Sequence, residues 1–162
     1  MPQLIKDHAL ARNEWVLGGG DAAAGAAKLI LPLEEYLAAI AAGEPARDRA
    51  VLLKAENLDL TPLLPCLATL PLIAVNFITT GDGRGYTQAM LLRERYGYKG
   101  ELRAVGKIRV DQVFFLARCG FDAFELLDDE DPQMAIAQLE RFSVAYQAGV
   151  DGLTHPRRRY SG

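Results

Sequence analysis

The sequence predicts an α/β protein built on a parallel sheet. From residue 50 onward, short apolar runs at 50–53, 72–77, 101–105 and 123–127 alternate with stretches whose apolar residues have helical spacing. The links between them are short, and this rhythm is typical of right-handed βαβ units. We therefore expect about four parallel strands, in an open sheet with helices on both faces. The alternative is a half-barrel, completed by a partner.

The chain before residue 50 is less regular. Residues 4–8 and 14–17 have strand character and predict a small N-terminal hairpin. Three consecutive glycines from position 18 then break the chain, and the Gly/Ala-rich stretch to residue 27 predicts a loop. Pro32 suits the first position of a helix over 33–42, because its fixed φ angle already fits a helix.

Four further helices are predicted between and after the strands, at 60–70, 87–96, 110–118 and 132–146. Gly97 and Gly120 follow the second and third of these, where a glycine commonly ends a helix in the left-handed conformation. An acidic run at 128–131 precedes the last helix and suits the partial positive charge of its N-terminus.

Length and composition favour a single domain over residues 1–162, because half of the 162 residues are apolar and suffice for one core. Within it, residues 1–30 form the hairpin and loop, and 149–162 form a polar basic tail. The net charge of −3 argues against a general attraction to nucleic acid or to anionic membranes. No apolar run approaches the roughly 20 residues of a membrane helix, and the start resembles no signal peptide. We expect a cytoplasmic protein.

Metal and cofactor motifs are not found in the sequence. Cys66 and Cys119 are far apart, no CxxC occurs, and we interpret both as reduced core thiols. His8 and His155 have no nucleophile or carboxylate at triad-like spacing. We therefore expect no metal site.

The most informative stretch is 81–88, which follows the second predicted strand. Ligands in parallel α/β folds gather beyond the carboxyl ends of the strands. Three glycines in five residues, Arg84 and the start of a helix predict an anion-binding loop for phosphate, sulfate, sulfite or a carboxylate. The alternatives are a tight turn, in which Asp82 caps the helix and Arg84 forms a salt bridge, and a protein-docking loop. The candidate ligand-binding residues here are Asp82, Gly83, Arg84, Gly85, Tyr86 and Thr87.

The loop after the third strand adds charge to the same edge of the sheet, at the carboxyl ends of the strands, which we call the rim. Lys107 and Arg109 are cationic, Asp111 is an N-cap or first-turn acid, and Gln112 follows it. Lys107, Arg109 and Gln112 are further candidate ligand-binding residues, and a solvated rim is the alternative. Asp82, Lys107 and Asp111 are the candidate catalytic acid–base groups.

Arg103 is unusual because it lies inside a strand that we expect to be covered. A buried guanidinium needs a partner, and the alternation of side chains makes Arg103 and Glu125 cross-strand neighbours. Asp82 and Asp111 are alternative partners. The group is either a structural ion pair or the floor of a polar pocket, so Arg103 and Glu125 join the candidate ligand-binding residues.

Four short motifs resemble those of a known family: DGRGYT at 82–87, GELRAVG at 100–106, Asp111-Gln112, and RCGFDAFEL at 118–126. They closely resemble a bacterial family whose members are commonly labelled as oxidoreductases involved in sulfite reduction. The resemblance covers roughly residues 50–162 well and the N-terminal third loosely. Lys107 stands where the family usually has an acid, which makes this loop more cationic.

The resemblance implies a role beside assimilatory sulfite or nitrite reductase. The chain has neither a cysteine set for a cluster nor a nucleotide fingerprint, so siroheme, iron–sulfur or flavin centres are expected on a partner, with no cofactor on this chain. We expect an accessory or subunit protein that docks to that reductase or to its electron donor. The cationic rim and the tail residues Arg157, Arg158, Arg159 and Tyr160 are the expected docking surfaces.

Two alternatives stay open: a small half-barrel enzyme acting on a phosphorylated or sulfo-compound, and a sensor that binds such an anion without turnover. A homodimer is also expected, because a small parallel sheet leaves edges that must be covered.

Overall fold

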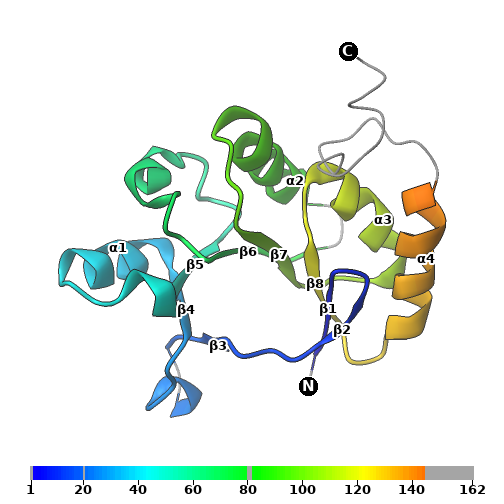
Figure 1. The fold of residues 1–162 in the computed structure, drawn as a ribbon, viewed down its shortest axis with the longest axis horizontal. Helices are drawn as coiled ribbons and strands as arrows, with labels where there is room; N and C mark the ends of the chain where they lie inside the picture. The colour runs from blue at the N-terminus through cyan, green and yellow to red at the C-terminus, as the bar shows by residue number, and fades with distance from the viewer. Residues whose placement is uncertain (1, 20, 80–81, 145–162) are drawn as a thin grey trace.

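The computed structural model describes residues 2–19, 21–79 and 82–144. It contains one eight-stranded sheet in the order β2-β1-β8-β7-β6-β5-β4-β3. The strands β3 to β8 are parallel and follow the chain order, and β1 pairs antiparallel with both β2 and β8. Figure 1 shows the sheet curling into a half-barrel. The strands are β1 (Gln3–Lys6), β2 (Ala9–Ala11), β3 (Val16–Leu17), β4 (Leu29–Pro32), β5 (Arg49–Leu53), β6 (Leu72–Phe77), β7 (Glu101–Gly106) and β8 (Ala123–Leu126).

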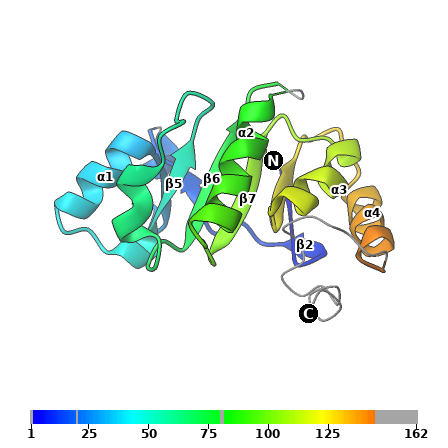
Figure 2. The same ribbon diagram turned by 90° about the horizontal axis from the view of Figure 1, so that it is seen from above.

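The helices lie on the convex face of the sheet, from α1 at one end to α4 at the other (Figures 1 and 2). The prediction of an α/β half-barrel is confirmed, and the first choice of helices on both faces is wrong. When every strand pairs with the one before it, right-handed crossovers place all helices on the same face. The α-helices are α1 (Leu33–Ala41), α2 (Gly83–Met90), α3 (Val110–Cys119) and α4 (Pro132–Val144). The shorter turns are η1 (Asp21–Ala23), η2 (Ala46–Asp48), η3 (Thr61–Cys66) and the π-helix η4 (Leu91–Arg95).

The N-terminal hairpin exists, but its second strand differs from the predicted one. Asp7 and His8 both have positive φ angles, 54° and 63°, and this tight turn directs the chain back along β1 at Ala9. Residues 14–17, predicted as the second strand, contribute β3 at the opposite edge of the sheet. With β4, where no strand was predicted, the parallel strands of the described residues number six.

Two of the predicted helices have a different form. Residues 60–70 contain only the 3₁₀ turn η3, because Pro65 in its interior lacks the N–H group that an α-helix needs there. Helix α2 begins at Gly83, four residues earlier than predicted, and continues directly into η4. Gly97 and Gly120 have φ angles of 66° and 115°, as expected for helix ends.

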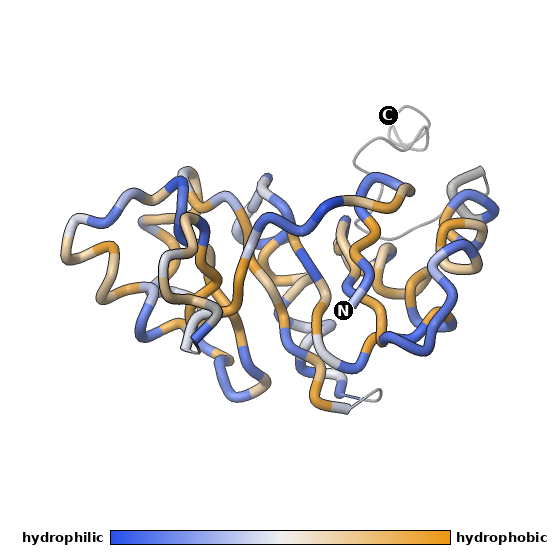
Figure 3. Tube along the Cα trace, turned by 90° about the horizontal axis from the view of Figure 1, so that it is seen from below, coloured by the Kyte–Doolittle hydropathy of each residue, from blue (hydrophilic) through white to orange (hydrophobic). Residues whose placement is uncertain are grey.

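The hydrophobic core has two parts, one on each face of the sheet. The larger lies between the strands and the helices, and the smaller lies on the concave face, where Ile30, Ala50, Leu72, Ala74 and Val105 pack together. Figure 3 shows the matching pattern, with hydrophobic stretches along the central strands and hydrophilic stretches in many of the loops. None of the helices in the described part of the chain combines the length and apolar character needed to cross a bilayer.

Residues 12–15, which we call the strap, connect the two ends of the curled sheet. The strap leaves β2 at one edge and reaches β3 at the other. On the way, Asn13 accepts a hydrogen bond from Arg103 of β7, and Trp15 packs against the apolar cluster of the concave face. The strap therefore covers the concave face.

Candidate functional site

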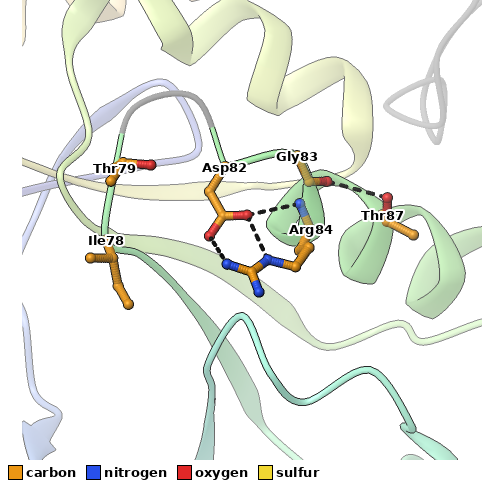
Figure 4. A pocket seen from close by; sticks show the side chains of 6 residues that line it. All are labelled: Ile78, Thr79, Asp82, Gly83, Arg84 and Thr87. Carbon is orange, nitrogen blue, oxygen red and sulfur yellow. Dashed lines mark hydrogen bonds and ion pairs between the residues drawn. The ribbon is translucent and has the colours of Figure 1, made fainter.

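A pocket of about 650 Å³ lies beyond the carboxyl end of β6. Four predicted ligand-binding residues line it, together with two that follow β6 directly (Figure 4): Ile78, Thr79, Asp82, Gly83, Arg84 and Thr87. Gly85, Tyr86, Lys107, Arg109 and Gln112 are not among its lining residues. The sequence analysis missed Ile78 and Thr79, because an apolar residue and a threonine after a strand carry no specific signal.

Asp82 and Arg84 form a closed local arrangement at the start of α2. The Asp82 Oδ1 atom accepts hydrogen bonds from the backbone N–H and the Nε of Arg84, both at 3.1 Å, and Oδ2 accepts one from Nη2 at 3.3 Å. These hydrogen bonds from Arg84 hold the pKa of the Asp82 carboxyl below its ordinary value, so that it is ionised at neutral pH. This is the capped, salt-bridged turn that the sequence left as an alternative. Anion binding by this loop stays a prediction.

The outward face of this turn is nevertheless cationic. The Arg84 side chain is 56% exposed, whereas the Asp82 side chain is 10% exposed. Because Asp82 covers only one side of the guanidinium, Arg84 can still donate hydrogen bonds toward the solvent. The pair therefore presents a positively charged side chain in a fixed orientation.

Gly85, Tyr86 and Thr87 make contacts that orient α2. A Cβ atom at Gly85 would lie 2.5 Å from the Phe77 ring, so only glycine allows this approach. The Tyr86 ring packs against Phe77 and Phe115, with centroid distances of 5.3 and 5.0 Å. The Thr87 hydroxyl donates to the Gly83 carbonyl oxygen at 3.2 Å. These contacts fix the first turn of α2 against the end of β6.

The loop after β7 is held against the end of β6 by its backbone. Gly106 has a φ angle of 96°, and its Cα lies so close to the Phe77 carbonyl that a side chain would not fit. The Lys107 N–H donates to that same carbonyl oxygen at 2.8 Å, and the Lys107 side chain is exposed. The two cationic positions of the rim, Arg84 and Lys107, therefore follow neighbouring strands.

Arg109 and Gln112 begin helix α3 together with an acid that the sequence analysis missed. The Arg109 guanidinium pairs with Glu130 at 2.8 Å, and Glu130 also accepts the Val110 N–H at 2.6 Å. Gln112 accepts the Arg109 N–H at 3.0 Å, and its Nε2 lies 3.5 Å from the Tyr86 hydroxyl. Glu130 belongs to the acidic run that we had related only to the last helix. Asp111 is an exposed first-turn acid, and the N-cap position is Arg109.

Gln88 is a further residue whose role was not predicted from the sequence. Its side chain is buried, and Nε2 donates to the carbonyl oxygens of Lys54 at 2.8 Å and Asn57 at 2.7 Å. Its Oε1 atom has no hydrogen-bond partner among the described residues. Gln88 therefore ties α2 to the loop after β5. The sequence does not predict this role, because the role depends on the carbonyl groups of Lys54 and Asn57, which are more than 30 residues away.

Arg103 and Glu125 lie on the concave face of the sheet, apart from the pocket. The predicted contact between them is present, at 3.4 Å. The Arg103 guanidinium also pairs with Glu101 at 2.7 Å and donates to Asn13 at 2.9 Å, and Lys6 pairs with Glu101 at 2.9 Å. Asp82 and Asp111, the alternative partners, are not involved.

The charges of this cluster balance, and its burial is deep. Arg103 is 2% exposed and lies between two carboxylates, while burial raises the pKa of Glu125 against the opposing effect of Arg103. With its guanidinium occupied by Glu101, Asn13 and Glu125, Arg103 has the geometry of a structural ion pair that fastens the strap. Neither Arg103 nor Glu125 lines the pocket beyond β6, so the alternative that they form the floor of a polar pocket has no support there.

Metal chemistry finds no support in the described ranges. Cys66 and Cys119 do not form a disulfide with each other, and no group of three His, Cys, Asp or Glu side chains in these ranges could hold a metal ion. The basic residues 157–160, predicted to bind a partner, lie outside the described residues.

Comparison of the sequence with models of protein families identifies a family. The model of a family described as "Bacterial protein of unknown function (DUF934)" matches residues 40–156. The matched range includes β5 to β8, the pocket and the whole rim, whereas β1 to β4 and the strap precede it. A search of curated proteins found no match.

Proposed function

We propose, starting from the fact that the chain belongs to the bacterial family DUF934, that it is an accessory protein of assimilatory sulfite reduction. It docks through the rim beyond β6 onto a cofactor-bearing sulfite or nitrite reductase, or onto the electron donor of that reductase. The assignment to sulfite reduction rests on the resemblance of the motifs at 82–87 and 100–106 to the family described above. The observation that supports docking is the surface chemistry around the pocket.

The rim combines an exposed apolar side chain with an oriented cation. Ile78 is 53% exposed directly after β6, and Arg84 borders the same pocket. Protein interfaces are enriched in arginine, and their centres are apolar. Because Asp82 already fixes the Arg84 side chain, less rotamer entropy is lost when a partner binds. This pair of features favours a protein-docking surface that can also meet an anionic group on the partner.

The candidate acid–base groups favour docking over catalysis. Asp82 is ionised and fully engaged with Arg84 and the helix N-terminus. Lys107 and Asp111 are exposed side chains on the rim. General acid–base catalysis is most efficient when a group is tuned toward neutral pKa by burial or by neighbours. Redox chemistry is accordingly assigned to the siroheme, iron–sulfur or flavin centres of the partner.

A second candidate is a half-barrel enzyme or sensor that binds a phosphorylated or sulfur oxyanion ligand. The observation in its favour is the exposed guanidinium of Arg84 at the first turn of α2, beside the Thr87 hydroxyl and the pocket. In this case sulfate, sulfite or a phosphate ester alone would raise the melting temperature, and Arg84→Ala would abolish the rise.

Capture of the tagged full chain from its own cells at low salt tests the docking proposal. We expect the eluate to contain a siroheme- or flavin-bearing protein, identified by absorbance spectra and mass spectrometry. Ile78→Asp should abolish this capture, because it places a charge in the interface. Leu17→Asp is the matched control, since Leu17 is 52% exposed but lies on β3. A colourless and solitary protein at low salt contradicts the proposal.

A further inference from the structure

A second hollow, of about 860 Å³, lies at the opposite end of the sheet from the rim. It is formed by the chain around η3 and by residues 95–100, which precede β6 and β7 respectively. We call it the amino-end groove, and the residues that matter for its chemistry are Leu64, Leu67, Arg95, Tyr96, Tyr98 and Lys99. It shares no lining residue with the pocket of the rim.

The π-helix η4 ends in one wall of this groove. The Tyr96 N–H donates to the Leu91 carbonyl at 3.0 Å, and the Tyr98 N–H donates to the Leu92 carbonyl at 2.8 Å. Wide turns of this kind are rare, and they occur frequently at functional sites. Here the wide turn directly precedes the loop that lines the groove, and Arg95 is its last residue.

The floor of the groove is fixed by buried hydrogen bonds. The Tyr98 hydroxyl donates to the Leu70 carbonyl at 2.9 Å, so that the buried ring joins both walls. Arg93 donates from Nη1 to the carbonyls of Tyr98 at 2.8 Å and Gly100 at 2.9 Å, holding the loop that carries Lys99. The groove is therefore preformed, and several carbonyls near this helix end are already satisfied by protein donors.

The lining of the groove combines two cations with apolar side chains. Arg95 and Lys99 are exposed, and neither forms an ion pair within the described ranges. No acidic residue lines the groove, whereas Leu64 is 41% exposed beside Leu67 and Tyr96. Arg93 already donates to the loop carbonyls of Tyr98 and Gly100, so these hydrogen bonds do not require Arg95 or Lys99.

We propose that the amino-end groove binds a small organic anion with an apolar body. The carboxylate, sulfonate or phosphate group of the ligand pairs with Arg95 and Lys99, and its apolar part lies against Leu64, Leu67 and Tyr96. The volume of the groove falls within the range of roughly 300–1,000 Å³ that is usual for small-molecule sites. This site is independent of the docking surface at the rim, so each proposal can fail without the other.

Two dyes that differ by one charged group test this inference on the full chain. 8-Anilinonaphthalene-1-sulfonate is an aromatic sulfonate, and N-phenyl-1-naphthylamine is its neutral counterpart. We expect the sulfonate to bind saturably, with a fluorescence increase, and to bind about tenfold more tightly than the neutral dye, because charge-assisted hydrogen bonds are the stronger kind. The double variant Arg95→Ala/Lys99→Ala should remove this tenfold preference without altering the far-UV circular dichroism.

Two further variants locate the binding. Leu64→Asp should weaken the binding of both dyes, because it places a carboxylate against the apolar wall of the groove. Arg47→Ala/Arg141→Ala removes two exposed cations that belong to neither the groove nor the rim, and it should change neither affinity. Equal affinity for the two dyes, or sulfonate binding that is indifferent to both groove variants, overturns the proposal.

Discussion

Arg103 joins parts of the chain that are distant in sequence. Its guanidinium contacts Glu101 on the same strand, Glu125 on β8 and Asn13 in the strap. A buried ion pair of this kind gives little net stability compared with an apolar core, but removing one partner leaves the others uncompensated. The loss of Arg103 would therefore leave the carboxylates of Glu101 and Glu125 without their shared partner.

We predict that Arg103→Ala lowers the free energy of unfolding by about 3–5 kcal/mol, because two carboxylates would then face each other in a covered site. Arg103→Lys should cost less, since it keeps the charge but loses the planar fork. Urea denaturation measures both. Arg47→Ala is the control, because the Arg47 side chain is 86% exposed. An Arg103→Ala variant as stable as that control would contradict this account.

At the residue scale, local patterns were readable from the sequence and long-range partners were not. The alternation of side chains along β7 and β8 predicted the Arg103–Glu125 contact, because the period of a strand fixes which face a residue takes. Asp82 and Arg84 are only two residues apart, and their helix cap and salt bridge were predicted as an alternative. The partnership of Asn13 with Arg103 depends on the path of the strap, which no local pattern specifies.

At the scale of elements, helix α2 owes its position to one close approach. Gly85 rests on the Phe77 ring at the end of β6, and the same ring packs against Tyr86. Gly83, two residues earlier, has open space around the position of a Cβ atom. The two glycines of the same turn therefore have different roles, and this difference can be measured.

We predict opposite outcomes for Gly85→Ala and Gly83→Ala in thermal or urea unfolding. Gly85→Ala places a methyl group 2.5 Å from the Phe77 ring and should destabilise by about 1–3 kcal/mol, as overpacking does. Gly83→Ala meets no steric contact and should stabilise by about 0.4–1 kcal/mol, because it restricts the unfolded chain. Equal effects of the two changes would show that the approach to Phe77 is not what fixes α2.

The elements that the sequence predicted well are those with strong apolar patterns. The bounds of β6 match the predicted run 72–77, and β5, β7, β8 and α3 differ by one residue at an end. The short strands β3 and β4 were missed or misassigned because two or four residues beside a glycine-rich stretch carry little periodic signal. The hairpin partner was wrong because the tight turn at Asp7 and His8 was not recognised, although both residue types are enriched at positive φ angles.

At the scale of the whole molecule, the strap keeps the concave face covered. It spans the sheet from β2 to β3, and Trp15 packs on the smaller apolar cluster. The sequence holds a single tryptophan, so its fluorescence reports directly on whether the strap is seated. The half-barrel itself was only the second choice from the sequence, because βαβ units alone do not say whether the strands keep their chain order.

We predict that Asn13→Ala loosens the strap. Loss of the hydrogen bonds that the Asn13 Oδ1 atom accepts from Arg103 and from the Trp15 N–H should lower the free energy of unfolding by about 1–3 kcal/mol and increase acrylamide quenching of Trp15. Glu14→Ala is the matched control on the same segment, since it removes only the exposed ion pair with Lys28 and should cost under about 1 kcal/mol. Quenching that is identical in the two variants would mean that the Asn13 side chain does not hold the strap.

The pairing of β1 with β8 has a consequence for synthesis on the ribosome. Ile5 is made early, but its partner Phe124 emerges only after most of the chain has been translated. At about 5–20 residues per second, β1 waits on the order of ten seconds for this neighbour. During that time the apolar residues of β1 have no native strand edge beyond the hairpin to pair with. The nascent chain is therefore a more natural client for chaperones than the finished protein.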